Sequence, residues 1–139
     1  YEVTLEDVMQ ALEKQGMTEQ DIERGDAIFF RYGWSKYWSD PEKYNQPAPG
    51  IGLEVAAWVV TKQVAMVGSD QSGLEVSRPD SELAIPVHQL LITQNGIWNL
   101  ENLDFSELAQ DQAYQFLFIF TPVRFKGATG SPGRPIAIK

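Results

Sequence analysis

The stretch that decides the fold class is LEVAAWVVTKQVAMVG, residues 53–68. Its first part, 53–60, repeats apolar residues at helical spacing, and Val64–Gly68 has the length and composition of a short buried strand. A helix that leads directly into a buried strand is the repeating step of proteins in which helices and strands alternate. The stretch therefore predicts an α/β fold.

The sequence before this stretch continues the alternation. Thr4, with Asp7 three residues later, has the pattern of a helix capping box, and Gly16 ends the helical spacing. Ala27–Tyr32 is β-branched and aromatic and predicts a mostly buried strand. Residues 33–50 form a long connection rich in tryptophan, tyrosine and proline, and connections of this length are usually functional or mobile.

The sequence after this stretch adds further elements. Residues 70–82 read as a polar loop, His88–Leu91 opens a short helix or turn, and Ile97–Leu100 predicts a strand. The most apolar run, Phe116–Phe120, has the length of a central strand rather than a helix. Because helices and strands alternate along the chain, we expect residues 1–139 to form a single domain.

Composition and charge exclude several classes of protein. The chain has 139 residues, with 11 Lys and Arg against 19 Asp and Glu, so its formal net charge of −8 disfavours nucleic acid and anionic membranes as partners. It has no cysteine and one histidine, which excludes disulfides, thiolate zinc sites and sites of several histidines within the chain. No apolar run approaches the roughly 18 residues of a membrane span. The compartment stays open, with a slight preference for the cytoplasm.

His88 and Glu101 have the clearest metal-ligand chemistry in the sequence. Neutral imidazole and carboxylate suit zinc or manganese, and a turn between the two residues can fold their segments side by side. A lone histidine beside a buried helix start, with Glu101 capping or solvated, is the commoner arrangement. Two ligands also do not complete a site of three or four, so the pair alone leaves both interpretations open.

Trp34, Trp38 and Asp70 are candidates with two interpretations each. The two tryptophans either wall an apolar pocket or anchor the long connection in the core. Asp70 follows a predicted strand, where polar groups often line α/β sites, and simple turn capping is the equal alternative.

Ser131 lies in the glycine-rich segment 127–133. This segment either cradles an anion or, more commonly, forms a tight loop before the last strand. A nucleophilic Ser131 needs His88 as its base and an orienting acid such as Asp70. The absence of a Gly-x-Ser-x-Gly elbow argues against a serine hydrolase.

Several segments along nearly the whole chain match one family pattern in the right order: Arg24–Ala27 with Phe30–Trp34, Pro49–Ile51 with Glu54–Trp58, Val67–Ser72, Pro86–Leu91, Gly96-Ile97 with Glu101–Leu103, and Gly127–Pro132 with Arg134–Ile138. Through them the sequence resembles the metal-dependent cyclase family, whose kynurenine formamidase-like members hydrolyse amides. The most specific matches are the segments that contain His88, Glu101 and Ser131.

The resemblance implies a fold, an activity and a set of site residues. The family has a swivelling β/β/α fold, usually in dimers or tetramers, so we expect a homo-oligomer. Its metal site, often zinc or manganese, activates water to hydrolyse a small amide, cyclic amide or ester. In that pattern His88 and Glu101 match the two C-terminal metal ligands. We further expect Trp34 and Trp38 to help wall the substrate pocket and the loop with Ser131 to lie at its edge.

One departure from the family pattern is as informative as the match. The other ligands and the proton shuttle belong to an N-terminal His-x-Gly-Thr-His-x-Asp-x-x-x-His motif, which a chain with one histidine does not contain. We therefore expect this chain to be the C-terminal portion of a cyclase-like hydrolase, with no catalytic residue of its own and inactive without the N-terminal half. The rival interpretation is a non-catalytic binding or assembly subunit that keeps the fold.

Overall fold

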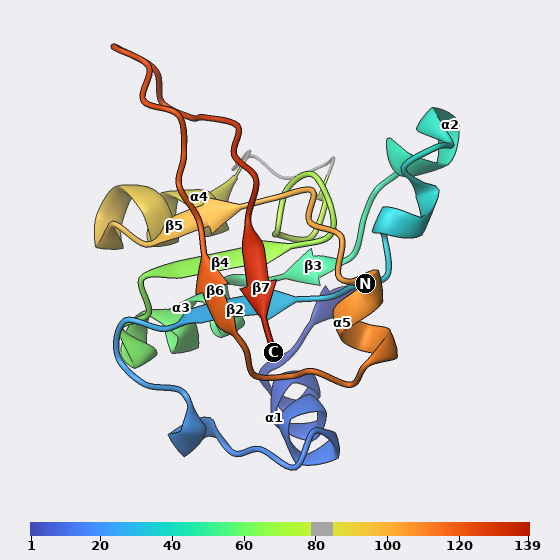
Figure 1. The fold of residues 1–139 in the computed structure, drawn as a ribbon, viewed down its shortest axis with the longest axis vertical. Coiled ribbons are helices and arrows are strands. Elements are labelled where there is room, and N and C mark those ends of the chain that lie inside the picture. Colours follow the sequence, from blue (N-terminus) through green and yellow to red (C-terminus); the bar gives the residue numbers. More distant parts are fainter. Residues whose placement is uncertain (79–84) are drawn as a thin grey trace. The chain divides into compact units, whose positions relative to one another are not determined.

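The computed structural model describes residues 1–78 and 85–139 (Figure 1). The chain divides into two compact units, Tyr1–Phe105 and Ser106–Lys139, each with its own elements. The expectation of a single domain stays a prediction. The predicted loop 70–82 lies within the described residues only as far as residue 78.

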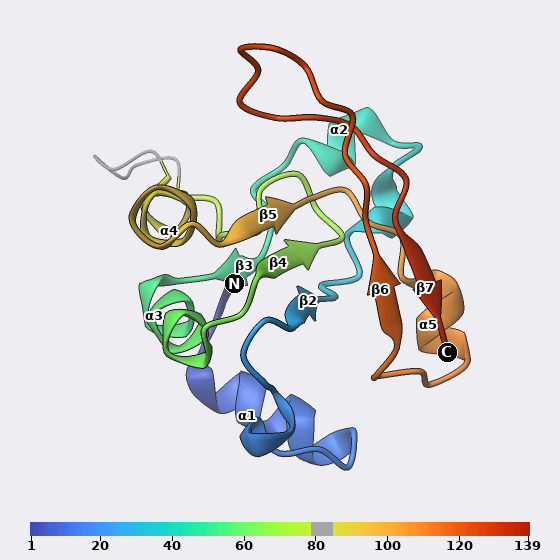
Figure 2. The same cartoon turned by 60° about the vertical axis from the view of Figure 1, so that its left-hand side comes forward.

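The first unit is built on a parallel sheet of three strands in the order β2, β4, β5 (Figure 2). These strands are β2 (Ala27–Phe30), β4 (Met66–Ser69) and β5 (Trp98–Leu100). Val67 in the central strand pairs with Ile28 on one side and with Asn99 on the other. The three strands predicted for this unit are confirmed. β2 ends before Tyr32, whose N–H donates to the Asp70 side chain instead of a neighbouring strand.

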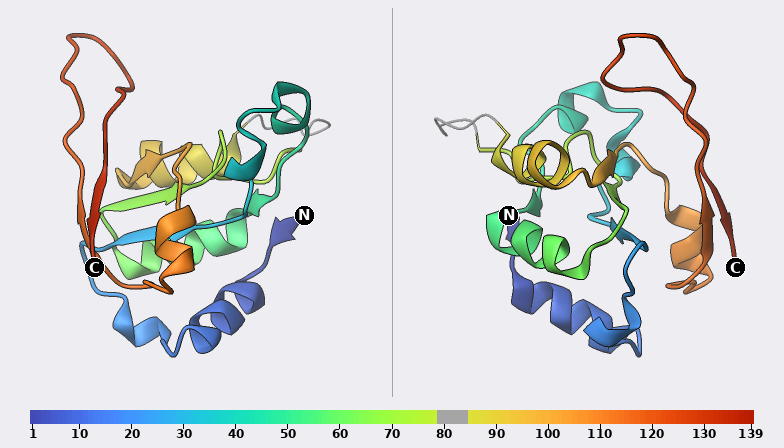
Figure 3. Two further views of the ribbon diagram at one scale, coloured as in Figure 1. Left: turned by 45° about the vertical axis from the view of Figure 1, so that its right-hand side comes forward. Right: turned by 90° about the vertical axis from the view of Figure 1, so that its left-hand side faces the viewer.

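Two ten-residue helices, α1 (Leu5–Lys14) and α3 (Leu53–Lys62), lie on one side of this sheet (Figures 2 and 3). The predicted capping box of α1 is confirmed, because the Thr4 and Asp7 side chains each accept a hydrogen bond from the other's backbone N–H. The core of the unit gathers around α3, where Val55 and Val59 have no exposed surface. Burial of the apolar face of α3 stabilises the packing of the helix in this unit.

The connections at the start of the unit are short or partly helical. β1 (Glu2–Val3) and β3 (Gly50–Ile51) form a separate parallel pair. A single 3₁₀ turn, η1 (Glu19–Asp21), precedes β2. The long connection 33–50 contains the 3₁₀ turn η2 (Ser35–Tyr37) and the short helix α2 (Pro41–Tyr44), so part of its backbone is helical.

The segment before β5 begins with α4 (Pro86–His88), as the sequence predicts for a helix or turn after Pro86. It continues directly into the π-helical segment η3 (Gln89–Gln94). Gly96, at φ +65°, then turns the chain into β5, which confirms the predicted turn. Within the described part of the chain, no helix is long and apolar enough to cross a bilayer.

The second unit contains α5 (Ser106–Gln110) and an antiparallel pair, β6 (Leu117–Ile119) and β7 (Ile136–Ile138). The apolar run Phe116–Phe120 does contain a strand, but the prediction of a central strand is wrong. β6 belongs to a two-stranded sheet, and Leu117 and Ile119 are 60% and 41% exposed. An apolar sequence favours a strand, but whether the strand lies in the centre of a sheet depends on how many other strands pair with it.

Candidate metal centre

The carboxyl ends of β2, β4 and β5 meet at one edge of the parallel sheet, where sites in α/β proteins usually form. Asp70 directly follows β4 and is 1% exposed. Its carboxylate accepts the backbone N–H of Tyr32 at 2.7 Å and of Trp34 at 2.9 Å. Of its two sequence interpretations, capping is therefore the one that the structure shows. Asp70 ties the start of the connection 33–50 to the end of β4.

His88 and Glu101 come together at this edge. His88 ends α4, Glu101 follows β5, and the Nε2 atom of His88 lies 3.0 Å from Oε1 of Glu101. The histidine side chain is 19% exposed and the glutamate 27%, so both are partly accessible to water. The two predicted metal ligands are therefore neighbours, joined through the turn before β5.

Asn99 is a third member of the group, and sequence reasoning missed it. Its Nδ2 lies 3.0 Å from Nε2 of His88 and 2.8 Å from Oε1 of Glu101. Asn99 precedes Glu101 by two residues on β5, and residues at that spacing in a strand share one face. This period of two is the signal that could have found it. Its Oδ1 is buried without a hydrogen-bond partner among the described residues.

Glu75 contacts the opposite side of the imidazole and was also missed. Its Oε1 lies 2.6 Å from Nδ1 of His88, and its Oε2 accepts the backbone N–H of Val87 at 2.8 Å. The Gln71 amide donates to the backbone carbonyl of Glu75 at 3.2 Å and to that of Pro49 at 2.9 Å. Glu75 lies in the loop after β4, where no regular spacing relates it to His88, so the sequence carried no local signal for it.

The two carboxylates act on the charge of the imidazole. In the protonated ring, Nε2–H donates to Glu101 and raises the pKa of His88 above its ordinary value, and Glu75 raises it further, while partial burial opposes both. A site with this much negative charge around one imidazole favours a bound cation, whether a proton or a metal ion.

The donor set suits part of a metal centre. Imidazole nitrogen and carboxylate oxygen are the ligands that zinc and manganese accept, and Nε2 and Oε1 converge on one point. Asn99 contacts both atoms through its Nδ2, and its buried Oδ1 has no hydrogen-bond partner among the described residues. Within residues 1–78 and 85–139, no group of three or more His, Asp or Glu side chains could hold a metal ion. His88 and Glu101 therefore fit as two ligands of a site that needs others.

The predicted pocket tryptophans lie in the connection that Asp70 holds. The Trp34 indole N–H donates to the backbone carbonyl of Tyr44 at 3.1 Å. Trp38 is 66% exposed and makes a T-shaped ring contact with Tyr44, at 5.3 Å between ring centroids. The Tyr44 hydroxyl donates to the Asn102 side chain, next to Glu101. Trp34 is thus partly anchored, whereas Trp38 presents its ring to solvent.

Burial raises the pKa of Tyr44, and the negative charges of Asp70 and Glu101 add to this effect. The negative charge of Glu101 therefore disfavours ionisation of the Tyr44 hydroxyl. The Tyr44 hydroxyl also donates to Asn102, so the second half of the connection 33–50 contacts the residue after Glu101.

Ser131 belongs to the second unit. Its hydroxyl donates to the carbonyls of Val123 and Pro132, so it stabilises a tight loop. The triad that a nucleophilic Ser131 would need is not assembled, because Asp70 bonds the backbone after β2 while the His88 nitrogens contact Glu75, Glu101 and Asn99. The Asp70–His88 contact that a serine hydrolase would need is therefore not formed, in line with the argument from sequence against such an enzyme.

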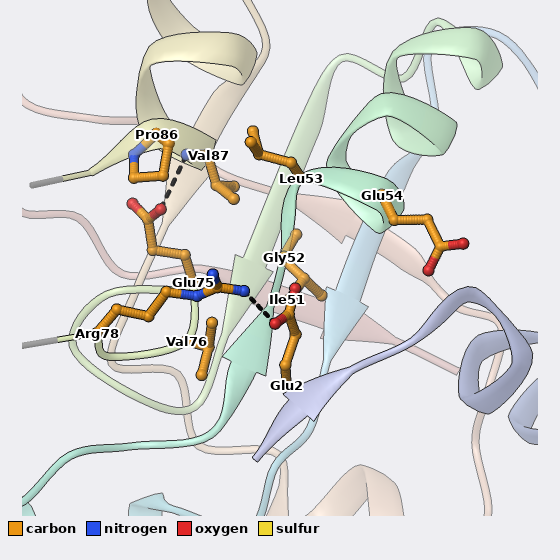
Figure 4. Close-up of a pocket in the computed structure, with 10 residues that line it drawn as sticks. All are labelled: Glu2, Ile51, Gly52, Leu53, Glu54, Glu75, Val76, Arg78, Pro86 and Val87. Atoms are coloured by element: carbon orange, nitrogen blue, oxygen red, sulfur yellow. Dashed lines mark hydrogen bonds and ion pairs between the residues drawn. The ribbon is translucent and has the colours of Figure 1, made fainter. Parts of the chain in front are cut away.

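A cavity of about 200 Å³ lies beside the group, between the start of α3 and the start of α4 (Figure 4). Glu75, Val87 and Leu53 are among its lining residues, and His88 and Glu101 are not. Figure 4 shows the Glu75 carboxylate bound to the N–H of Val87, and Arg78 paired with Glu2 across the cavity. The cavity lies on the Glu75 side of the imidazole, so the convergent Nε2 and Oε1 atoms are not part of it.

The sequence of the chain matches a known protein family. The sequence model of the family described as putative cyclase matches residues 1–76, more than half of the chain. The chain belongs to the cyclase family. No curated protein sequence matches it. The family assignment confirms the resemblance seen in the sequence.

Solved structures of cyclase-type proteins superpose on the chain. A structure described as a novel cyclase is 32% identical with a TM-score of 0.86, and it matches 100% of this chain and 47% of its own. Isatin hydrolase A from Ralstonia solanacearum is 21% identical with a TM-score of 0.78, matching 100% of this chain and 54% of its own. A predicted metal-dependent hydrolase from Bacillus stearothermophilus is 19% identical with a TM-score of 0.68, matching 98% and 56%.

These matches confirm the expected α/β fold of the cyclase type. The chain spans about half the length of the solved structures that it matches. A cyclase of that length therefore has a further half that this chain does not represent.

Proposed function

We propose that the chain supplies part of the active site of a metal-dependent hydrolase that cleaves a small amide, cyclic amide or ester. The observation that carries the proposal is the convergence of Nε2 of His88 and Oε1 of Glu101, 3.0 Å apart, with a buried carboxylate behind the imidazole. Metal-bound histidines typically donate their second ring N–H to such a carboxylate.

His88 and Glu101 would hold a divalent metal, zinc or manganese, together with ligands from elsewhere in the protein. A bound metal of this kind lowers the pKa of water toward neutrality and polarises a substrate carbonyl. In this chain Glu75 and Asn99 keep the two ligands in place from either side. We assign no catalytic residue to the chain and expect it to be inactive without the N-terminal half of the protein.

Two observations support the proposed substrate class: the name of one matching structure and an exposed aromatic surface near the centre. A matching structure is an isatin hydrolase, whose name denotes hydrolysis of a cyclic amide. In this chain Trp38 offers a flat, solvent-accessible ring beside Tyr44, which suits a small planar substrate. We assign Trp34 a supporting role in the same wall and keep Ser131 as a predicted substrate-binding residue. We propose that the enzyme works as a homo-oligomer.

One observation favours a second function, a non-catalytic binding or assembly subunit. Among the described residues only two side chains qualify as metal ligands at the centre, fewer than a complete site requires. A subunit that kept the fold without the other ligands would retain the His88–Glu101 contact as a structural hydrogen bond.

The experiment that separates the two functions combines the chain with an N-terminal half from a full-length family member. Hydrolysis of isatin and of an aryl formamide is measured with Zn²⁺ or Mn²⁺ for the wild type, His88→Ala and Glu101→Gln, with Glu54→Gln as the control for an exposed carboxylate. We expect turnover for the wild type and the control only. Equal turnover in all four proteins would remove His88 and Glu101 from the site, and no turnover in any would favour the non-catalytic subunit.

A further inference from the structure

We propose that Glu75 is a positioning residue that holds His88 in the tautomer with its proton on Nδ1, so that the Nε2 lone pair faces Glu101 and Asn99. The proposal rests on the proposed function only for its consequence, since the Nε2 lone pair is the one that a metal would take. The tautomer itself depends on the contacts of the imidazole alone.

Two carboxylates compete for the single proton of the neutral imidazole. The Glu75 contact to Nδ1 is 2.6 Å, whereas the Glu101 contact to Nε2 is 3.0 Å. The Glu75 side chain is 9% exposed and that of Glu101 is 27% exposed, so water weakens the second contact more. A short charge-assisted bond in a drier environment is the stronger one, which places the proton on Nδ1.

The amide of Asn99 gives an independent argument for the same tautomer. Its Nδ2 lies 3.0 Å from Nε2 of His88 and 2.8 Å from Oε1 of Glu101, and an amide NH₂ group has two donors and no acceptor. Both contacts are hydrogen bonds only if Nε2 accepts. An accepting Nε2 carries no proton, so the proton of the neutral ring is on Nδ1.

Glu75 can fix the ring because its own position is fixed. Its Oε2 accepts the N–H of Val87, the residue before His88, so one carboxylate holds both the backbone and the ring of the same turn (Figure 4). The Gln71 amide holds the Glu75 carbonyl. A Cβ at Gly50 would lie 2.3 Å from the Glu75 backbone carbon, so the two segments are in close contact. Hydrogen bonds and close backbone packing therefore fix the position of the Glu75 side chain.

The chain offers a direct test because His88 is its only histidine. A long-range ¹H–¹⁵N spectrum of the neutral imidazole then reports one ring and distinguishes Nδ1–H from Nε2–H. Glu75→Met removes the acceptor and keeps the length of the side chain. Glu75→Gln is the milder second variant, because its amide oxygen can accept from Val87 or from His88 but not from both. Glu54→Gln, which lines the same cavity without touching the imidazole, is the matched control.

We expect the Nδ1–H tautomer in the wild type and in Glu54→Gln, and a mixture or the Nε2–H form in both Glu75 variants. In a Zn²⁺ titration of the chain combined with an N-terminal half from a full-length family member, we expect the Glu75 variants to bind about 10- to 100-fold more weakly than the wild type, the loss typical of such outer partners. The backbone amide spectrum of each variant shows whether it folds. If Glu75→Met does not fold, the tautomer is determined in Glu75→Gln instead.

The outcomes separate this proposal from the proposed function. An unchanged Nδ1–H tautomer in a folded Glu75 variant, or Nε2–H in the wild type, would overturn the role of Glu75 even if Zn²⁺ binds. A tautomer that depends on Glu75 in a wild type that binds no Zn²⁺ would support the positioning role and contradict the metal site.

Discussion

Nε2 of His88 and Oε1 of Glu101 lie 3.0 Å apart, and the Asn99 amide is within 3.0 Å of both atoms. The contact joins the end of α4 to the residue after β5, two elements that the turn at Gly96 connects. When Nε2 carries a lone pair, the two atoms are both acceptors and their contact favours a cation between them.

Asp70→Asn tests the link between β4 and the aromatic connection. The buried carboxylate accepts three backbone N–H bonds, from Tyr32, Trp34 and Ser35, and an amide with one oxygen and one NH₂ group cannot accept all of them. We expect a loss of about 2 kcal/mol in the free energy of unfolding, measured by urea titration. Asp111→Asn, which breaks an exposed ion pair with Lys139, should cost less than about 1 kcal/mol. Equal losses in the two variants would contradict the assigned role of Asp70.

Gly50→Ala tests the packing behind Glu75. An added Cβ would lie 2.3 Å from the Glu75 backbone carbon and 2.4 Å from the Val76 nitrogen, so the backbone of one segment must shift. We expect a loss of about 1–3 kcal/mol, typical of overpacking, in chemical denaturation. Gly130→Ala is the matched control, because nothing lies within 4 Å of its added Cβ, and its change should stay within about 0.5 kcal/mol. A Gly50→Ala protein as stable as the control would show that the contact is not tight.

The capping box of α1 gives a prediction for pH. Hydrogen bonds from the Thr4 backbone and hydroxyl lower the pKa of Asp7 below its ordinary value of 3.8, and the Tyr1 hydroxyl adds to this. A lowered folded-state pKa means that Asp7 stabilises the helix fully above the unfolded pKa, and that this contribution disappears as the pH falls through the folded pKa.

The measurement is the thermal unfolding of the wild type and of Asp7→Ala by circular dichroism between pH 6 and pH 2. We expect the wild type to melt at a higher temperature at pH 6 and the difference to shrink steadily below about pH 4. Glu13→Ala, on the same helix, should show no such convergence. A difference between wild type and Asp7→Ala that is the same at every pH would rule out the capping carboxylate as its source.

Trp38→Ala separates a pocket wall from a structural anchor. The side chain is 66% exposed, so its loss should change the free energy of unfolding by less than about 1 kcal/mol, whereas Trp58→Ala, at a 9% exposed core position, should cost about 3–5 kcal/mol. In the enzyme completed by its N-terminal half, we expect Trp38→Ala to raise KM for isatin about tenfold, corresponding to ~1.4 kcal/mol. A stability loss as large as that of Trp58→Ala, or an unchanged KM, would count against the wall.

The parts of the fold that depend on local sequence were predictable. The capping pair Thr4 and Asp7, the apolar face of α3 and the strand β4 are each encoded by spacing over a few residues. The contact between His88 and Glu101 was a reasonable expectation because a turn joins their segments. The assignment of the two residues as metal ligands came from the resemblance to the cyclase family, and it remains a proposal.

The parts that depend on tertiary contacts were not predictable. Glu75 reaches His88 through a loop whose path is set by Gln71 and Gly50, and neither contact follows a period in the sequence. Phe116–Phe120 was expected to be a central strand, but β6 pairs with β7 alone in a two-stranded sheet. Apolar character predicts that a strand forms, whereas its number of neighbours depends on the rest of the fold.

The most direct test of the central claim is a calorimetric titration of Zn²⁺ into the chain combined with an N-terminal half from a full-length family member, for the wild type, His88→Ala and Glu101→Gln, with Glu54→Gln as control. We expect one Zn²⁺ bound per completed enzyme in the wild type and the control, and much weaker binding in both ligand variants. Binding of equal affinity in all four proteins, or in none, would contradict the assignment of His88 and Glu101 as metal ligands.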